Sequence, residues 1–232
     1  KEILESAVNT SNKVTTELGV KKVPVTVKMR MGIDDEHLTY IEAGKIAAKA
    51  GVTWVALHAR TAEQMYSGKA RWHAIKTLVE ELKEFNVPVL GNGDIWSAQD
   101  ALEMVRETGC AGVVVGRGCL GRPWLFGQLA AAFAGKEIPK DPGLEVVSQI
   151  IKRHAVLLCE LYGEYKGIRD IRKHMAWYLK GFSVGNQLRT SLAMVESLEN
   201  LDFLLAKLDT NQAFPEVVVD KPRGRVGSQK KV

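Results

Sequence analysis

Four short apolar segments rich in β-branched residues recur along the first half of the sequence. They are VPVTVKMR (23–30), TWVALHAR (53–60), VPVLGNGD (87–94) and AGVVVGRG (111–118). Continuous apolar character over so few residues is typical of strands covered on both faces, as in a parallel sheet. Helix-length segments at 39–50 and 97–109 lie between them and end near Gly51 and Gly109, the residue type that commonly terminates helices. Repeated strand–helix units predict an α/β fold, either open-wound or part of a barrel.

The pattern changes beyond about residue 135. Gly135, Pro139 and Pro142 indicate a linker. Apolar residues at helical spacing then predict a small all-α domain with helices over 143–162, about 167–180 and about 187–208. The last segment is Gly-rich and basic and is predicted to be disordered. The predicted domains are therefore residues 1–135, residues 143–210 and a basic tail of residues 211–232.

Charge and composition narrow the class of protein. The net charge is +5, and the whole surplus lies in residues 151–232, where 14 Lys and Arg face 9 Asp and Glu. A locally basic segment favours a polyanionic partner. No apolar run reaches the roughly 18 residues that a membrane span needs, so we expect no membrane partner. The three cysteines lack metal-ligand or disulfide spacing, so we expect no metal and a reducing, cytoplasmic location.

Polar residues gather where the predicted strands end. In a (β/α)₈ barrel these positions build the active site, and a buried Lys or Arg there needs an anion. Each residue has another reading: Lys28 can extend to solvent, His58 can be a core histidine, and GNGD can be only a turn. Because all four groups share the same position in their units, we prefer a phosphate site. The groups are Lys28 with Arg30, His58 with Arg60, Asn92 with Asp94, and Gly116 with Arg117 and Gly118.

Longer motifs carry a family resemblance. VPVTVKMR, LHARTAEQMYSGKARW, VPVLGNGDI and GVVVGRGCLGRPWLF, in this order, resemble the second half of the tRNA-dihydrouridine synthase barrel, and GIRDIRKHMAWYLKGF resembles the signature of its helical domain. The resemblance covers roughly residues 20–190. It implies the C-terminal half of a (β/α)₈ TIM barrel, with four parallel strands, followed by a small all-α helical domain. Similar proteins use FMN and NADPH to reduce uridine to 5,6-dihydrouridine in the tRNA D-loop.

The resemblance also implies roles for individual residues. In the family, reduced FMN gives a hydride to C6 of the uracil and a cysteine donates a proton to C5. Arg60 would face the substrate phosphate or the target base. The residues themselves suggest one further surface: the basic side of the 167–180 helix is either a solvated face or binds tRNA phosphates through Arg169, Arg172, Lys173 and Lys180. Trp177 and Tyr178 are close enough to this side for stacking or for packing in the core. The implied FMN contacts are Lys28, His58, Asn92, Gly93, Asp94, Gly116 and Arg117.

The sequence departs from the family at the catalytic cysteine. That residue follows an Asn-x-Gly-Cys-Pro loop that this sequence lacks, and none of Cys110, Cys119 and Cys159 fits its position. We therefore expect a fragment without a catalytic residue, which binds FMN weakly and does not reduce uridine by itself. Three alternatives remain open: an FMN-dependent barrel oxidoreductase acting on a small molecule, a non-catalytic tRNA-binding fragment, and a phosphate-binding barrel isomerase or aldolase without flavin.

Overall fold

The structure, a computed structural model, describes residues 1–216. These residues form two compact units, and the first comprises Lys1–Ile95 and Gln99–Gly116. The second comprises Trp96–Ala98 and, among the described residues, 117–216. The boundary at Gly116 falls earlier than the linker predicted near residue 135, because the helix that precedes the linker belongs to the second unit.

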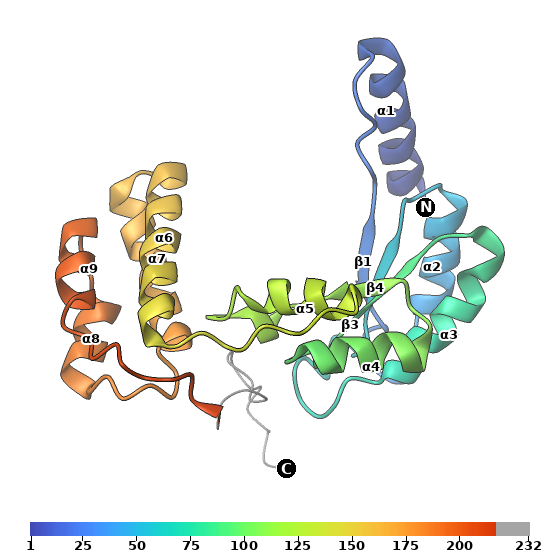
Figure 1. Cartoon of the computed structure of the whole chain (residues 1–232). Coiled ribbons are helices and arrows are strands. Elements are labelled where there is room, and N and C mark those ends of the chain that lie inside the picture. Colours follow the sequence, from blue (N-terminus) through green and yellow to red (C-terminus); the bar gives the residue numbers. More distant parts are fainter. Residues whose placement is uncertain (217–232) are drawn as a thin grey trace. The chain divides into compact units, whose positions relative to one another are not determined.

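A four-stranded parallel sheet forms the centre of the first unit (Figure 1). Its strands are β1 (Val27–Arg30), β2 (Val55–His58), β3 (Val89–Asn92) and β4 (Gly112–Val114). They follow one another in the order β1-β2-β3-β4. All four lie within the segments that the sequence predicts, and the arrangement is consistent with part of a TIM barrel.

Helices cover one face of this sheet (Figure 1). An added Cβ at Gly44 would lie 2.7 Å from Leu78 and 3.4 Å from Met29, and one at Gly91 would lie 2.4 Å from the sulfur of Met104. Glycine therefore permits the close contact between the strands and their helices. The helices of this unit are α1 (Glu2–Leu18), α2 (Tyr40–Lys49), α3 (Trp72–Leu82) with the 3₁₀ turn η1 (Lys83–Phe85), and most of α4 (Ala98–Thr108).

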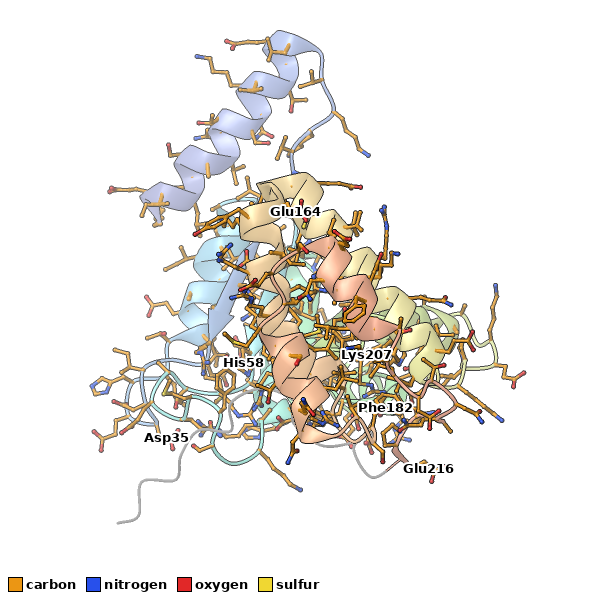
Figure 2. All side chains as sticks on the ribbon, turned by 90° about the vertical axis from the view of Figure 1, so that its left-hand side faces the viewer. Asp35, His58, Glu164, Phe182, Lys207 and Glu216 are labelled. Atoms are coloured by element: carbon orange, nitrogen blue, oxygen red, sulfur yellow. The ribbon has the colours of Figure 1, made fainter. Side chains whose placement is uncertain are left out.

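The second unit is helical. Its elements are the 3₁₀ turn η2 (Arg117–Cys119), α5 (Leu125–Phe133), α6 (Leu144–Tyr162), α7 (Glu164–Tyr178), α8 (Asn186–Ala193) and α9 (Leu198–Leu205). The last four pack around one apolar core that includes Ile151, Ile168, Leu192 and Leu201, each fully buried. Figure 2 labels Glu164 at the start of α7 and Phe182 just after its end.

Two predictions about the C-terminal third are wrong. The helix predicted over about 187–208 is two helices, because Ser197 caps a new helix by accepting a hydrogen bond from the backbone N–H of Asn200 at 3.0 Å. The predicted disordered tail begins too early, since Phe214 is buried and meets the rings of Trp124 and Phe182 edge to face. Residues 217–232 lie outside the described part of the chain.

Candidate functional site

Parallel pairing aligns the carboxyl ends of the strands in one row. The register pairs Arg30 with His58, His58 with Asn92, and Asn92 with Val114. Lys28 lies two residues before Arg30 on the same strand. Side chains two residues apart on a strand point to the same face. Lys28, His58 and Asn92 therefore share one face of the sheet, as the sequence predicts for a common site.

This face is opposite the one that the helices cover, because the neighbouring residue Met29 points toward Gly44 of α2. Lys28 is exposed there. Desolvation by the surrounding protein, and then the positive charge of Arg30, lowers the pKa of the Lys28 ammonium. Two neighbouring cations at the end of a strand form a site that favours an anion.

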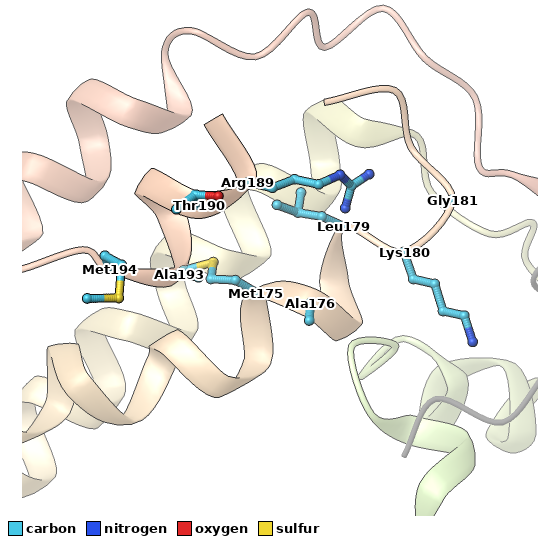
Figure 3. A pocket seen from close by; sticks show the side chains of 9 residues that line it. All are labelled: Met175, Ala176, Leu179, Lys180, Gly181, Arg189, Thr190, Ala193 and Met194. Atoms are coloured by element: carbon cyan, nitrogen blue, oxygen red, sulfur yellow. The ribbon is translucent and has the colours of Figure 1, made fainter. Parts of the chain in front are cut away.

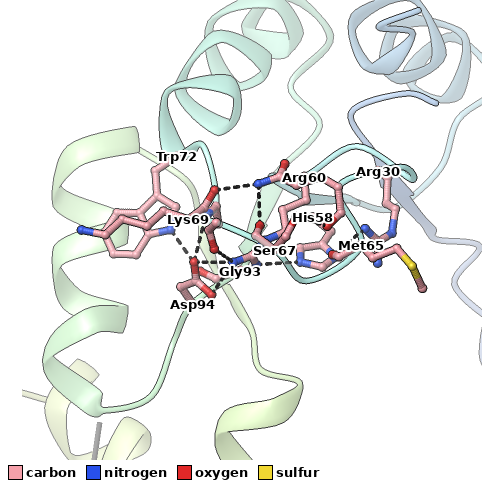
Figure 4. Close-up of polar contacts among 12 residues, drawn as sticks. Arg30, His58, Arg60, Met65, Ser67, Lys69, Trp72, Gly93 and Asp94 are labelled. Atoms are coloured by element: carbon pink, nitrogen blue, oxygen red, sulfur yellow. Dashed lines mark hydrogen bonds and ion pairs between the residues drawn. The ribbon is translucent and has the colours of Figure 1, made fainter. Parts of the chain in front are cut away.

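The buried Arg60 and the half-buried Asp94 form an ion pair beside this row (Figure 4). Arg60 is 1% exposed, and its Nη2 donates to both Asp94 carboxylate oxygens at 2.8 and 2.7 Å and to the Gly68 carbonyl at 2.9 Å. Asp94 also accepts from the backbone N–H of Ala70 at 2.7 Å. The pair thus joins the end of β2, the loop after it and the turn after β3.

These contacts bear on two predictions, those for Arg60 and Asp94. A direct contact between Arg60 and RNA does not fit a guanidinium that is almost fully buried and already bonded to a carboxylate. The Asp94 carboxylate is likewise directed at Arg60, and a carboxylate repels a phosphate. In this structure both residues join the loop after β2 to the turn after β3, and their roles toward RNA and the flavin stay predictions.

The turn after β3 requires a glycine. Gly93 has a φ of +129°, and an added Cβ would lie 2.6 Å from the Cβ of Ala70 and 3.4 Å from the His58 ring. Its carbonyl accepts a hydrogen bond from the Trp72 indole at 3.0 Å. The Asn92 side chain donates to the Val114 carbonyl at 2.6 Å, so it also holds the end of β4. His58, Asn92 and Gly93 are therefore brought together.

The two remaining predicted flavin contacts belong to different units. Gly116 is exposed at the end of the first unit, and an added Cβ there would meet nothing within 4 Å. Arg117 belongs to the second unit, where its guanidinium lies 5.0 Å from the centre of the Trp96 ring. That Arg117 joins the other predicted residues stays a prediction.

The predicted RNA-binding cations lie on or just after α7 in the second unit. Arg169 lies over the Tyr165 ring at 3.6 Å, and Lys173 is exposed and 3.5 Å from Asp170. Arg172 is half-buried and donates from Nε to the Val195 carbonyl at 2.7 Å, so it holds the segment between α8 and α9. Lys180 follows the end of α7.

A histidine pair lies beside these cations. The His154 and His174 rings are 4.7 Å apart between centroids, and His154 Nδ1 lies 3.0 Å from the hydroxyl of Tyr178. Burial, then His154 and then Lys173, lowers the pKa of His174 to about 4, and burial raises the pKa of Tyr178 to about 12. Tyr178 is 3% exposed, which favours packing in the core over stacking on RNA, the two roles considered for its ring.

Comparison with known proteins identifies the family. Residues 3–216 match the family described as dihydrouridine synthase (Dus). The chain belongs to this family. It is 56% identical to a probable tRNA-dihydrouridine synthase of Mycobacterium leprae (strain TN). The alignment of 207 residues covers 89% of this chain and 53% of the relative. It is 36% identical to tRNA-dihydrouridine synthase B of Xanthomonas axonopodis pv. citri (strain 306). This alignment of 209 residues covers 90% of the chain and 60% of the relative.

The match confirms the resemblance seen in the sequence motifs. The chain spans about half the length of the curated relatives that it matches. Within residues 1–216, no group of three or more His, Cys, Asp or Glu side chains is arranged to hold a metal ion. In that same part of the chain, no helix combines the length and the apolar character that crossing a membrane demands.

None of the three cysteines of this chain, all within the described residues, forms a disulfide. Cys110 is buried, and its thiol lies 3.3 Å from the Gly112 carbonyl. Burial raises the pKa of the thiols of Cys119 and Cys159. A raised pKa disfavours the thiolate, as in a structural cysteine.

A second Arg–Asp pair, in the helical unit, was not predicted from the sequence. Arg122 is 2% exposed, and its Nη2 lies 3.0 Å from Oδ1 of Asp141. The same oxygen accepts from the Trp124 indole at 2.6 Å, and Arg122 also donates to the Trp96 carbonyl at 2.8 Å. Two sequence features could have predicted this pair. Arg122 lies inside the apolar run GRPWLF, and Asp141 precedes Pro142 in a segment that was interpreted only as a linker.

Proposed function

We propose that this chain supplies the flavin-binding strand ends and the RNA-binding helices of an FMN-dependent tRNA-dihydrouridine synthase, which reduces uridine in the tRNA D-loop. The observation that supports this most is the shared face of Lys28, His58 and Asn92 in a chain of this family. The names of the relatives supply the reaction and its tRNA substrate.

The residues at the strand ends fit a phosphorylated flavin. Lys28 offers a cation on the face without helices, and His58 packs against Gly93 beside it. At Gly116 the open space beyond Cα lets the backbone approach a phosphate. When bound, FMN reduced by NADPH supplies the hydride for the uracil ring.

The protein's own residues position this site. Lys28 contributes positive charge, and Gly93 with Gly116 allows close backbone approach. The Arg60–Asp94 pair holds the loop after β2 against the turn after β3, which keeps His58 in place. Cys110, Cys119 and Cys159 have no part in the chemistry of this proposal.

Helices α6–α9 form the all-α tRNA-binding domain in this proposal. Lys173 and Lys180 are its phosphate contacts, whereas Arg172 acts by supporting the loop that follows α8. The target base must leave its stack to reach a flavin, so a surface that holds the RNA is needed in addition to the cofactor site.

A flavin titration tests the cofactor site. We expect the quenching of FMN fluorescence by the full chain to weaken about tenfold with Lys28→Ala, the loss of one charged contact. Lys76→Ala on α3, also an exposed lysine, is the matched control and should bind FMN like the wild type. Equal FMN affinity for Lys28→Ala and wild type would contradict the proposal.

A further inference from the structure

The turn between α6 and α7 displays large apolar side chains to solvent. Tyr162, the last residue of α6, is 47% exposed, and Tyr165, the second residue of α7, is 76% exposed. Leu161 beside them is 69% exposed. Exposed apolar residues are normally scattered singly over a protein surface, so three of them within one turn indicate a contact surface.

Each of the two tyrosine rings has a cation on one face. The guanidinium carbon of Arg169 lies 3.6 Å from the centre of the Tyr165 ring, and Nζ of Lys166 lies 4.2 Å from the centre of the Tyr162 ring. Arg169 also donates from Nη1 to the Tyr165 carbonyl at 2.9 Å, which holds the guanidinium over the ring. Because Tyr165 is 76% exposed with this cation in place, the other face of its ring is open to solvent. The aromatic corner is made of Leu161, Tyr162, Tyr165, Lys166 and Arg169.

The surrounding helices hold the aromatic corner in place. Gly163 joins α6 to α7 with a φ of +78°, a conformation that favours glycine. An added Cβ at Gly167 would lie 2.5 Å from the backbone nitrogen of Cys159, so the two helices are in close contact behind the turn. Glu164 accepts a hydrogen bond from the Leu198 backbone N–H at 3.0 Å, which links the turn to α9. A ligand therefore meets rings and charges that are already in position.

The charges of the aromatic corner favour an anion. Lys166 and Arg169 are exposed, and neither forms an ion pair with a carboxylate of residues 1–216. The acidic residues nearby in sequence have other partners. Glu160 forms an ion pair with a cation of α6 at 3.7 Å, Asp170 forms one with a cation of α7 at 3.5 Å, and Glu164 bonds α9. A cation beside an open ring suits a nucleotide, because its phosphate is negative and its base is flat.

The groove between α7 and α8 offers less to a base than the aromatic corner does. It has a volume of about 520 Å³ and is drawn in Figure 3. Met175 and Leu179 line it, yet each is only 1% exposed, so a ligand in the groove would touch little of them. The exposed rings of Tyr162 and Tyr165 are the larger contact surface for a flat group.

We propose that the aromatic corner binds unpaired nucleotides of the tRNA, with a base stacked on the open face of Tyr165 and phosphates beside Lys166 and Arg169. The inference rests on the proposed tRNA-binding function and adds a stacking surface to it. The nucleotides are unpaired because the faces of a base inside a duplex are covered by its neighbours. An apolar protein segment would cover the rings but leave both cations without an anion.

Fluorine NMR of the full chain labelled with 3-fluorotyrosine provides the first test. The chain has five tyrosines, and Tyr40, Tyr66 and Tyr178 lie outside the aromatic corner. Unmodified tRNA and a short oligoadenylate are each expected to shift the signals of Tyr162 and Tyr165. With the oligoadenylate, the signal of Tyr178 should stay in place, because Tyr178 is 3% exposed. A long RNA duplex at the same nucleotide concentration should leave both corner signals in place, and equal shifts with the duplex would overturn the proposal.

Affinity measurements with matched variants provide the second test. Tyr165→Ala is expected to weaken tRNA binding about tenfold, the effect of losing one stacked base, whereas Tyr165→Phe should bind like the wild type. Phe203→Ala on α9 is the control, because Phe203 is 60% exposed and Nζ of Lys207 lies 4.0 Å from the centre of its ring. Lys166→Ala should reduce the salt slope of binding by about one, whereas Lys207→Ala should not.

The outcomes separate the aromatic corner from the function on which it rests. If tRNA binds while Tyr165→Ala matches the wild type and both corner signals stay unshifted, the stacking surface is wrong and tRNA binding stands. If tRNA does not bind the chain at all, both proposals fail. Corner signals that move with protein concentration in the absence of RNA would assign the corner to a second copy of the chain and overturn the proposal. Loss of affinity in Tyr165→Ala but not in Phe203→Ala, together with shifts of Tyr162 and Tyr165, supports the surface.

Discussion

The ion pairs at the end of the sheet and in the helical bundle differ in how exposed their charged side chains are. At the sheet, Arg60 is 1% exposed and paired with Asp94 inside the protein. In the bundle, Lys152 and Asp202 form a pair at 2.7 Å whose side chains are 55% and 47% exposed. The difference shows that a charged residue near a predicted site can hold the protein's own loops in place instead of contacting a ligand. Burial of its charged group distinguishes the two roles.

The largest expected effect is the loss of the Asp94 carboxylate, which is the counter-ion of the buried Arg60. Asp94→Asn leaves the Arg60 charge buried without a counter-ion, and we expect the free energy of unfolding to fall by about 3–5 kcal/mol. Asparagine suits this position because Asp94 has a φ of +53°, which asparagine tolerates. Urea denaturation followed by circular dichroism measures the change.

The exposed pair serves as the comparison for this variant. Asp202→Asn should lower the free energy of unfolding by no more than about 1 kcal/mol, as is usual for surface ion pairs. If both variants lose the same amount, the contrast between the two regions is wrong.

A smaller effect is expected within the bundle, between two neighbouring cations of α7. Arg172→Ala removes the bond to the Val195 carbonyl and should lower the free energy of unfolding by about 1.5–3 kcal/mol. Lys173→Ala should change it by less than about 0.5 kcal/mol, because Lys173 is exposed. Thermal denaturation of both variants gives the comparison, and a Lys173→Ala loss as large as that of Arg172→Ala would reverse the roles assigned here.

The smallest expected effect is a dependence of bundle stability on pH. The pKa of His174 is about 4 in the folded protein, below its ordinary value of 6.5, so the unfolded chain takes up this proton more readily. Stability is therefore complete above pH 6.5 and declines as the pH falls toward 4. The melting temperature should be lower at pH 5 than at pH 7, and His174→Phe should reduce this difference. An unchanged difference in that variant would remove His174 as the cause.

Much of the fold follows from local sequence patterns. Each predicted strand contains an observed strand, and the helix ends near Gly51 and Gly109 are confirmed, since both glycines have positive φ values, +85° and +70°. Periodicity failed at α8 and α9 because the apolar repeat continues through the break at Val195 and Ser197. A capping serine was the only local signal there.

The site was harder to predict than the fold. Sequence position predicted Lys28, His58 and Asn92 at strand ends. The strand register places them on one face, with His58 and Asn92 at strand ends and Lys28 at the second position of β1. Sequence position did not reveal that Arg60 would be paired with Asp94, a residue 34 positions away. Such a pairing depends on how loops fold over the sheet, which no repeat in the sequence records.

The order of the strands has a consequence for how this chain is made. Because β1, β2, β3 and β4 adjoin one another in the order of synthesis, each strand leaving the ribosome meets the edge of the strand formed just before it. No strand must wait for a later one to separate two neighbours, and each pairing closes only one short crossover. The sheet is thus suited to forming strand by strand during translation, because the strand added last exposes the edge with which the next strand pairs.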